Sequence, residues 1–225
     1  MAVSATRNSK EPKRTDTEAP PTALRRLLPS ASFLVVLTAV VCLSLLAPTL
    51  VGVTAAQDAT ADGPTVYVGS DDGNVYAVDA EDGTELWSYE TNGTVWSSPT
   101  VVDGTVYVGS DDGNVYAIDA EDGTELWSYD TGEPRVRTSP TVVDGTVYVG
   151  GGETAVGGTG GKIHAIDATD GTETWSLETN SATQSVISVA DGTVYAGEKN
   201  GVVHALDVES GNETWRFETD SSALS

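Results

Sequence analysis

The stretch AVDAEDGTELW, residues 77–87, decides the fold because it recurs three more times along the chain. The copies read AIDAEDGTELW (117–127), AIDATDGTETW (165–175) and ALDVESGNETW (205–215). Their last residues, the tryptophans at 87, 127, 175 and 215, are 40, 48 and 40 residues apart. Self-similarity at such a spacing is typical of repeat proteins, so we predict four structural repeats.

Each repeat is predicted to form short β-strands. TVYVG (65–69) and NVYAVD (74–79) are rich in β-branched and aromatic residues, and the Asp-Asp-Gly between them favours a hairpin turn. A second turn, Glu-Asp-Gly, leads into TELWSYE (84–90), and SPTVV (98–102) is the expected innermost strand. Four short strands in such a unit are the pattern of a β-propeller blade.

The spaced pattern A-x-D-x-x-x-G-x-x-x-W, with SSPTVVDGTVYVGSDDG (97–113) ahead of it, resembles the PQQ-like (pyrroloquinoline quinone) repeat family. That family includes the propellers of quinoprotein dehydrogenases and of the lipoprotein that helps to assemble outer-membrane β-barrels. The resemblance covers residues 63–225 and implies an all-β propeller in which the pattern is a tryptophan-docking motif. It implies that the tryptophans are wedged between neighbouring blades and that the aspartates orient the preceding turn. These docking residues are Trp87, Trp127, Trp175, Trp215, Asp79, Asp119, Asp167 and Asp207.

We expect a boundary at residue 57, with a basic region and a signal segment over 1–56 and the propeller over 57–225. The first repeat starts at its second strand, and the last one has no SPTVV-like segment after it. The innermost strand is therefore expected only three times. The blades are predicted over 63–102, 103–143, 144–190 and 191–225, the last without a continuation.

Four repeats are half of the eight blades that propellers of the family usually have. Three explanations stay open: a truncated reading frame, two half-rings that form an eight-bladed homodimer, or a small four-bladed ring that lacks one strand. In an open arc, unpaired strand edges would promote association.

The segment before the repeats carries export signals. An apolar run over 33–46 has the length of a signal-peptide h-region, follows paired arginines at 25–26 and precedes small residues at 53–56. This order predicts cleavage near 55–56, and the paired arginines suggest the twin-arginine route. The alternative is an uncleaved anchor over 33–53, which is long enough to cross a bilayer. Both interpretations place the repeats at the cell surface or in the extracellular space.

Charge excludes several functions for the repeats. The chain has 11 basic and 34 acidic residues, of which 6 basic and 3 acidic ones precede residue 57. The repeats therefore carry 5 basic and 31 acidic residues, a net charge of −26. Nucleic-acid binding needs a basic face and is excluded. Repeats with such an excess of acidic residues fit a protein that works in concentrated salt, which indicates a halophilic source. Cys42, the only cysteine, precedes the repeats, so they hold neither a disulfide nor a cysteine-bound metal.

Several motifs are better explained by structure than by chemistry. The Asp-Asp-Gly triplets at 71–73 and 111–113 could supply Ca²⁺ ligands, but hairpin turns explain them fully. His164 and His204 stand where the first two repeats have tyrosine, which favours a partly buried aromatic packing site over a metal site. Residues 150–161 lack the P-loop pattern and contain a seven-residue hairpin insertion. Quinoprotein dehydrogenases often use a disulfide of adjacent cysteines, which the repeats lack. We therefore expect no catalytic residue, no metal and no cofactor, neither PQQ nor Ca²⁺.

One position varies in a way that packing alone does not demand. Trp96, Arg137 and Gln184 are in register just before the innermost strand, and Arg135 lies beside Arg137. The resemblance places this region at the axial mouth, and aromatic and arginine side chains are the usual anchors of interfaces. These four residues are the candidate binding site, with blade-specific packing as the alternative. Asn92 and Asn212 begin glycosylation sequons.

Together these features predict an exported, salt-adapted, non-catalytic module that binds a protein or ligand at the cell surface. The fold alone does not identify the partner, because propellers host many functions. The alternatives are a quinoprotein dehydrogenase completed by a second chain and the extracellular sensor domain of a larger system.

Overall fold

The structure is a computed structural model that describes residues 63–152, 160–183 and 185–219, together with the backbone of 50–60. The chain divides into two compact units, Met1–Leu43 and Ser44–Ser225, and every described residue belongs to the second. No helix in these described ranges is long and apolar enough to cross a membrane. The predicted signal segment before residue 50 and the predicted binding residue Gln184 lie outside the described residues.

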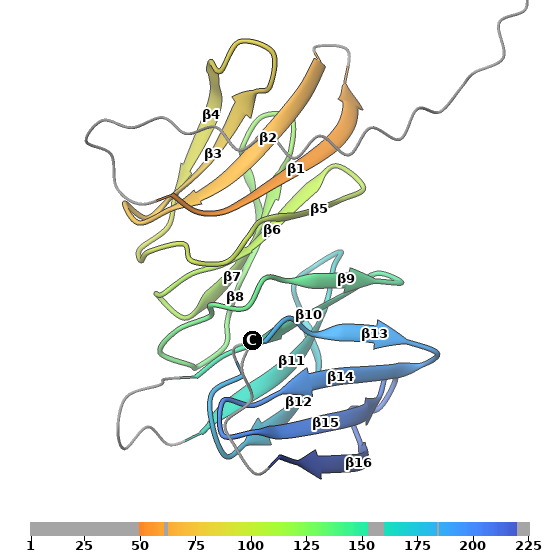
Figure 1. Cartoon of the computed structure of the whole chain (residues 1–225). Coiled ribbons are helices and arrows are strands. Elements are labelled where there is room, and N and C mark those ends of the chain that lie inside the picture. Colours follow the sequence, from red (N-terminus) through yellow and green to blue (C-terminus); the bar gives the residue numbers. More distant parts are fainter. Residues whose placement is uncertain (1–49, 61–62, 153–159, 184, 220–225) are drawn as a thin grey trace, which may run out of the picture. The chain divides into compact units, whose positions relative to one another are not determined.

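The described residues form four antiparallel sheets of four strands each, in which neighbours along the chain pair with one another (Figure 1). We call these sheets blades 1 to 4. Blade 1 contains β1 (Leu50–Thr60), β2 (Gly63–Ser70), β3 (Asn74–Asp79) and β4 (Glu85–Glu90). Blade 2 contains β5 (Thr100–Val102), β6 (Thr105–Gly109), β7 (Asn114–Asp119) and β8 (Glu125–Asp130). Blade 3 contains β9 (Thr141–Val143), β10 (Thr146–Gly150), β11 (Gly161–Asp167) and β12 (Glu173–Thr179). Blade 4 contains β13 (Ser188–Ala190), β14 (Thr193–Gly197), β15 (Val202–Asp207) and β16 (Glu213–Glu218).

The first blade has an innermost strand that the sequence analysis did not expect. β1 pairs with β2 in antiparallel register, with Val53 opposite Val68 and Ala56 opposite Thr65. The expectation of only three innermost strands was therefore wrong. Residues 50–60 read LVGVTAAQDAT and share no SPTVV signature, but pairing through main-chain N–H and C=O groups does not require one.

The blade boundaries also differ from the predicted ones. Residues 100–102 pair with β6 of the same repeat, so the SPTVV segment opens blade 2 and does not close blade 1. The hairpin between β5 and β6 explains this assignment. Its central residues, Asp103 and Gly104, have φ of 49° and 76°. Positive φ at both positions is the type I′ geometry that matches the twist of paired strands.

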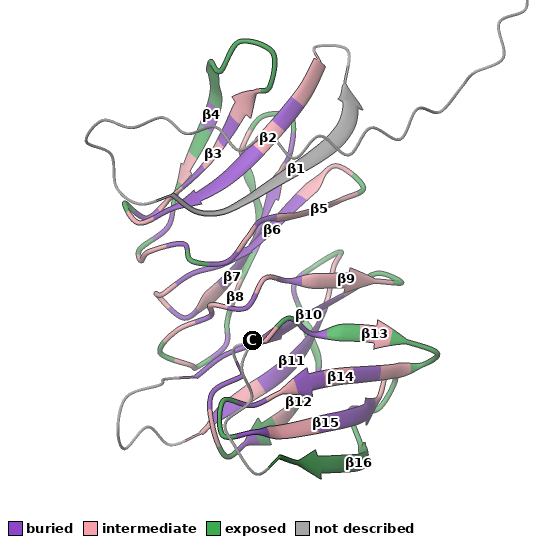
Figure 2. Cartoon of the chain, viewed as in Figure 1, coloured by how far each residue is buried: buried purple, intermediate pink, exposed green. Residues whose placement is uncertain are grey.

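The apolar core lies between the blades. We call the side of a blade that carries its docking tryptophan the tryptophan face, and the side that receives the preceding blade the cradle face. The first interface joins Tyr67, Val75, Ala77 and Trp87 of blade 1 to Val106, Val108, Ile118 and Ala120 of blade 2. Corresponding residues form the second and third interfaces. The buried residues accordingly follow the middle strands of the blades, whereas exposed residues gather on the outer strands (Figure 2).

Candidate functional site

Three of the four docking tryptophans reach into the next blade. The indole Nε1 of Trp87 donates a hydrogen bond to the carbonyl oxygen of Ala120 at 3.0 Å. Trp127 donates in the same way to Ala168, and Trp175 to Val208, each at 3.0 Å. Each of these interfaces thus has a directional indole–carbonyl bond in addition to its apolar contacts.

A glycine makes room for each of these three indoles. Gly123 has a φ of +75°, and a Cβ placed on it would lie 2.7 Å from Cδ2 of Trp87. Gly171 and Gly211 stand in the same relation to the next two tryptophans, at 2.8 Å and 2.5 Å. Both the positive φ and the close approach of the ring therefore require glycine at the seventh position of the motif.

The motif aspartates hold the turn that contains this glycine. Oδ1 of Asp79 accepts hydrogen bonds from the backbone N–H of Glu81 and Asp82, and Asp119 does the same in blade 2. Asp167 accepts from the N–H of Thr169. Asp207 accepts from the N–H and the hydroxyl of Ser210. The turn follows the aspartate and precedes the tryptophan, so in blades 2 to 4 these carboxylates shape the loop on which the indole of the preceding blade docks.

Trp215 is the exception among the docking tryptophans. Its side chain is 49% exposed, against 8–9% for the other three. Among the described residues no carbonyl accepts a bond from its indole nitrogen. The motif is the same as in the other repeats, so the difference arises because no described blade packs on Trp215 and not from the residue itself.

Three of the four predicted binding residues come together in the structure. Trp96 lies in the loop between β4 and β5, and the guanidinium carbon of Arg137 lies 5.3 Å from its ring centroid. Nε and a terminal amine of Arg137 donate to the two oxygens of Asp111 at 2.7 Å and 2.6 Å. Arg135 lies 3.9 Å from the same carboxylate. We call Trp96, Asp111, Arg135 and Arg137 the Trp96 patch.

The patch is held rigidly from both sides. The backbone N–H of Asp111 donates to the carbonyl of Thr94 in the loop that carries Trp96. The N–H of Val136 donates to the carbonyl of Ser110, which fixes the loop that carries both arginines. The pairing with Asp111 raises the pKa of Arg137, so its guanidinium stays charged. Asp111 was missed as a site residue because its Asp-Asp-Gly triplet was fully explained as a turn.

Chemically, the Trp96 patch offers an exposed aromatic ring beside an oriented cation. Trp96 is 41% exposed, and the side chains of both arginines are about one-third exposed. A guanidinium fork fixed by a carboxylate loses little freedom on binding, and cation–π contact orients the indole beneath it. With two arginines and one aspartate the patch has a net charge of +1, although the repeats as a whole are strongly acidic.

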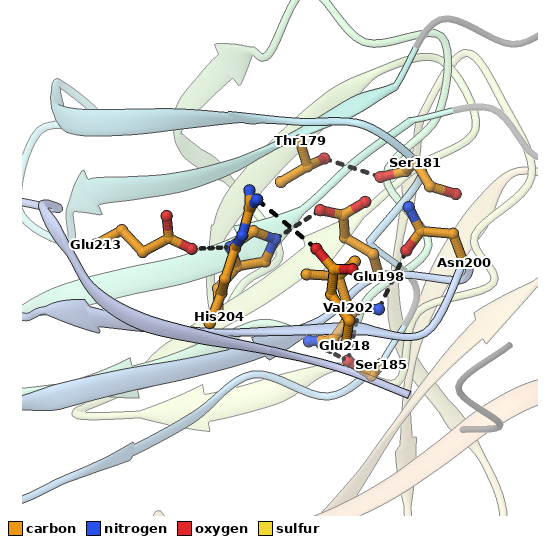
Figure 3. Close-up of polar contacts among 11 residues, drawn as sticks. Thr179, Ser181, Ser185, Glu198, Asn200, Val202, His204, Glu213 and Glu218 are labelled. Atoms are coloured by element: carbon orange, nitrogen blue, oxygen red, sulfur yellow. Dashed lines mark hydrogen bonds and ion pairs between the residues drawn. The ribbon is translucent and has the colours of Figure 1, made fainter. Parts of the chain in front are cut away.

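A second polar cluster surrounds His204 in blade 4 (Figure 3). Nε2 of His204 lies 2.5 Å from Oε1 of Glu198, and Nδ1 of the same ring lies 3.0 Å from Oε1 of Glu213. Each nitrogen of the imidazole ring therefore faces one carboxylate oxygen. Glu198 is completely buried, and its Oε2 has no hydrogen-bond partner among the described residues.

Blade 3 has a related arrangement around His164. Its Nδ1 lies 2.8 Å from Oε2 of Glu173, while its Nε2 has no partner among the described residues. Burial lowers the pKa of His164 below its ordinary value of 6.5, and the contact with Glu173 offsets this effect only in part. The ring also packs edge-on against Tyr129, with centroids 5.7 Å apart.

The two histidines therefore correct the sequence interpretation. They are almost fully buried, not partly buried, and each contacts a glutamate on the outer strand of its own blade. In blade 2 the same position holds Tyr116, whose hydroxyl donates to Asp112 at 2.7 Å. The signal that sequence reasoning missed is Glu198, which replaces a serine in the hairpin of the first two repeats.

No metal site emerges from these acidic and histidine side chains. Glu198 and Glu213 approach opposite nitrogens of one imidazole ring, so they do not converge on a common point. Within the described ranges no three histidine, cysteine or carboxylate groups are arranged to hold one ion. Asp72 and Asp112 accept hydrogen bonds within their own hairpins, from Asn74 and Tyr76 and from Asn114 and Tyr116.

Solved structures with the same fold include BamB and quinohemoprotein alcohol dehydrogenases. BamB from Moraxella catarrhalis superposes with a TM-score of 0.63 at 22% identity, over 76% of this chain and 54% of its own. The quinohemoprotein alcohol dehydrogenase ADHIIG from Pseudomonas putida HK5 gives 0.64 at 23% identity, over 70% and 33%. The corresponding enzyme from Comamonas testosteroni gives 0.63 at 22% identity, over 72% and 34%. The chain thus spans between one-third and about half of these proteins.

Sequence comparison identifies the family directly. A search of curated proteins found no match. The family model described as outer membrane protein assembly factor BamB, in contrast, matches residues 43–156 and 141–225. These matches include all four docking motifs and the strand β1. The chain therefore belongs to the BamB-like family of PQQ-like β-propellers.

Proposed function

We propose that this chain is an exported, salt-adapted scaffold that binds a protein partner through the Trp96 patch. The observation that carries the proposal is the arrangement of Trp96 under a guanidinium that Asp111 fixes in a bidentate pair. Family membership supports a scaffold role, because the matching model is named for an assembly factor. At 22–23% identity, the quinohemoprotein neighbours show the fold alone.

The chemistry of the patch suggests what the partner presents. In concentrated salt, long-range attraction between charges is screened, so binding depends on direct contact. An indole offers stacking, and the two arginines offer hydrogen bonds to carboxylate or carbonyl oxygens. A protein segment with an aromatic or aliphatic side chain next to an acidic one would satisfy both.

The binding test compares variants at the patch with a matched surface control. Tagged wild-type protein, Trp96→Ala, Arg137→Lys and Leu126→Ala would be cross-linked in the producing cells, and the attached proteins quantified by mass spectrometry. Leu126 is the control because its apolar side chain is also about half exposed. We expect Trp96→Ala and Arg137→Lys to reduce the same discrete partner by about tenfold or more. Equal capture by all four proteins would contradict the proposal.

Export is part of the proposal and has its own test. The basic pair at 25–26 and the apolar run over 33–46 support it. Because β1 begins at Leu50, cleavage at 55–56 would remove the first half of this strand. We therefore favour processing before residue 50, or retention of an anchor that ends before β1 and is thus shorter than the predicted 33–53. Intact-mass measurement of the protein from the cell surface or medium would decide, and a first residue after 55 would contradict this choice.

The non-catalytic assignment is checked by a quinone-dependent assay. The protein would be incubated with PQQ, Ca²⁺, an alcohol and a redox dye. We expect no dye reduction above that of PQQ and Ca²⁺ alone. A protein-dependent rate that requires PQQ would instead favour the dehydrogenase alternative.

A further inference from the structure

The two end blades present the two halves of an interface that the protein already uses three times. Each internal interface joins a tryptophan face to a cradle face, with an indole seated on a glycine and bonded to a backbone carbonyl. Blade 4 has a tryptophan face and blade 1 has a cradle face, and neither is covered by described residues.

The tryptophan face of blade 4 is open but preformed. Trp215 and Phe217 are 49% and 60% exposed, and every residue of β16 is exposed (Figure 2). In the other three blades the outer strand buries its tryptophan. Tyr195 packs on Trp215 with ring centroids 5.9 Å apart, within the 5.7–6.0 Å of the three buried pairs. The indole is therefore already held in its docking orientation.

The cradle face of blade 1 is open in a complementary way. Gly83 has a φ of +78°, and no atom of the described residues lies within 4 Å of the position of a Cβ, whereas Gly123, Gly171 and Gly211 each meet an indole there. Ala80 is exposed, whereas its equivalent Ala120 is 8% exposed and accepts the bond from Trp87. Asp79 accepts the same two backbone hydrogen bonds as Asp119 in the occupied turn of blade 2, so the turn of blade 1 is shaped to receive a tryptophan.

We infer that Trp215 of one copy docks on the Ala80–Gly83 turn of a second copy, so that two copies join head to tail at both ends. The indole nitrogen donates to the carbonyl of Ala80, and Phe217 lies against the outer strand of the partner's blade 1. Phe217 has no hydroxyl group, so it cannot donate a hydrogen bond to a glutamate of the facing blade. Leu177, which packs at the third interface, also lacks a hydroxyl group, so the proposed joint resembles an interface that the fold already contains.

Two features argue for a second copy as the occupant. Its cradle carries the same motif as the three internal ones, so the new contact continues an established interface without new chemistry. The chain also spans 54% of the BamB chain on which it superposes, so two copies supply about one such propeller. A head-to-tail contact either closes or grows into a filament, and two copies of this size favour closure.

The experiment measures the solution mass of the protein as its host processes it, in about 3 M KCl, where the acidic bodies no longer repel one another. The variants are Trp215→Ala, which removes the indole, and Gly83→Asn, which fills the cradle with a residue that tolerates positive φ. Gly145→Asn is the matched control, because Gly145 has a φ of 75° and equally open surroundings away from both faces. Circular dichroism would verify that each variant is folded.

We expect twice the monomer mass for the wild type, Gly145→Asn and Trp96→Ala, and association at least about tenfold weaker for Trp215→Ala and Gly83→Asn. A mixture of the two weak variants should recover part of the dimer, since one of its two joints then has an intact indole and an intact cradle. Because Trp96→Ala leaves the mass unchanged, failure of this inference and failure of the partner-binding proposal are distinguishable. A wild-type monomer, a dimer indifferent to Trp215→Ala, or a series of larger masses would overturn the closed dimer.

Discussion

At the scale of single residues, the repeats allow each side chain to be compared with its equivalents in the same molecule. The position of Tyr116 and Asp112 in blade 2 is taken by His204 and Glu198 in blade 4, with the acid displaced along the hairpin. A hydroxyl–carboxylate bond is thus replaced by an imidazole between two carboxylates. Both arrangements pair two polar side chains at a buried position, which explains why the histidine and the glutamate of blade 4 replace the tyrosine and the aspartate of blade 2 together.

Replacement of Glu198 tests the energetic weight of this cluster. Glu198→Ala leaves Nε2 of His204 buried without a partner, and we expect the free energy of unfolding to fall by about 2 kcal/mol or more. Glu198→Gln keeps a polar group at the same place that can pair with Nε2, so its effect should stay below about 1 kcal/mol. Denaturant unfolding at constant salt measures both. Equal losses would show that the contact with His204 contributes nothing specific.

His164 gives the protein an acid-sensitive contribution to stability. Burial lowers its pKa in the folded state, so the unfolded chain binds a proton first as the pH falls below 6.5. The stability that the neutral imidazole permits is complete above that pH and is lost as the pH falls toward the folded-state pKa. His164→Phe should flatten the dependence of stability on pH between about 7 and 5. An unchanged slope in that range would contradict this role.

At the scale of strands and turns, the docking motif was predictable because its chemistry is local. The aspartate, the turn and the glycine occur within seven residues, and these geometric requirements leave a visible pattern. β1 was not predictable in this way, since its backbone pairs with β2 without the SPTVV signature. The contact between Trp96 and Arg137 was only partly predictable. Alignment of the repeats placed both residues just before an innermost strand. Asp111, which holds the guanidinium of Arg137, lies in a different loop, the turn between β6 and β7.

Two tryptophans with one motif should differ in their effect on folding. Trp127→Ala empties a buried docking site, and we expect a loss of about 3–5 kcal/mol in unfolding free energy. Trp215→Ala should cost less than about 1 kcal/mol when both are compared in a Gly83→Asn background, where the second copy is displaced. Denaturant titration at equal salt provides the values. A large loss for Trp215→Ala in that background would mean that it supports its own blade.

At the scale of the whole molecule, the sequence predicted the number of repeats and the fold, but it could not show which faces are covered. Trp87 and Trp215 have the same motif, and only the three-dimensional arrangement separates the buried residue from the exposed one. The insertion in blade 3 was placed correctly between β10 and β11. Charge also acts at this scale, because an acidic excess spread over all repeats affects solubility and association more than any single contact.

The exposed outer strand of blade 4 has a consequence for local opening. Blades that contact only their neighbours unfold most readily at a free end, so amide protons of β16 should exchange with solvent faster than those of β8. Pairing with a second copy removes that free end. Exchange in β16 should therefore slow as protein concentration rises while exchange in β8 stays constant, as hydrogen–deuterium exchange mass spectrometry can measure. The strand β16 would then report how much of the protein is paired, and the time that it spends unpaired would set its exposure to proteases.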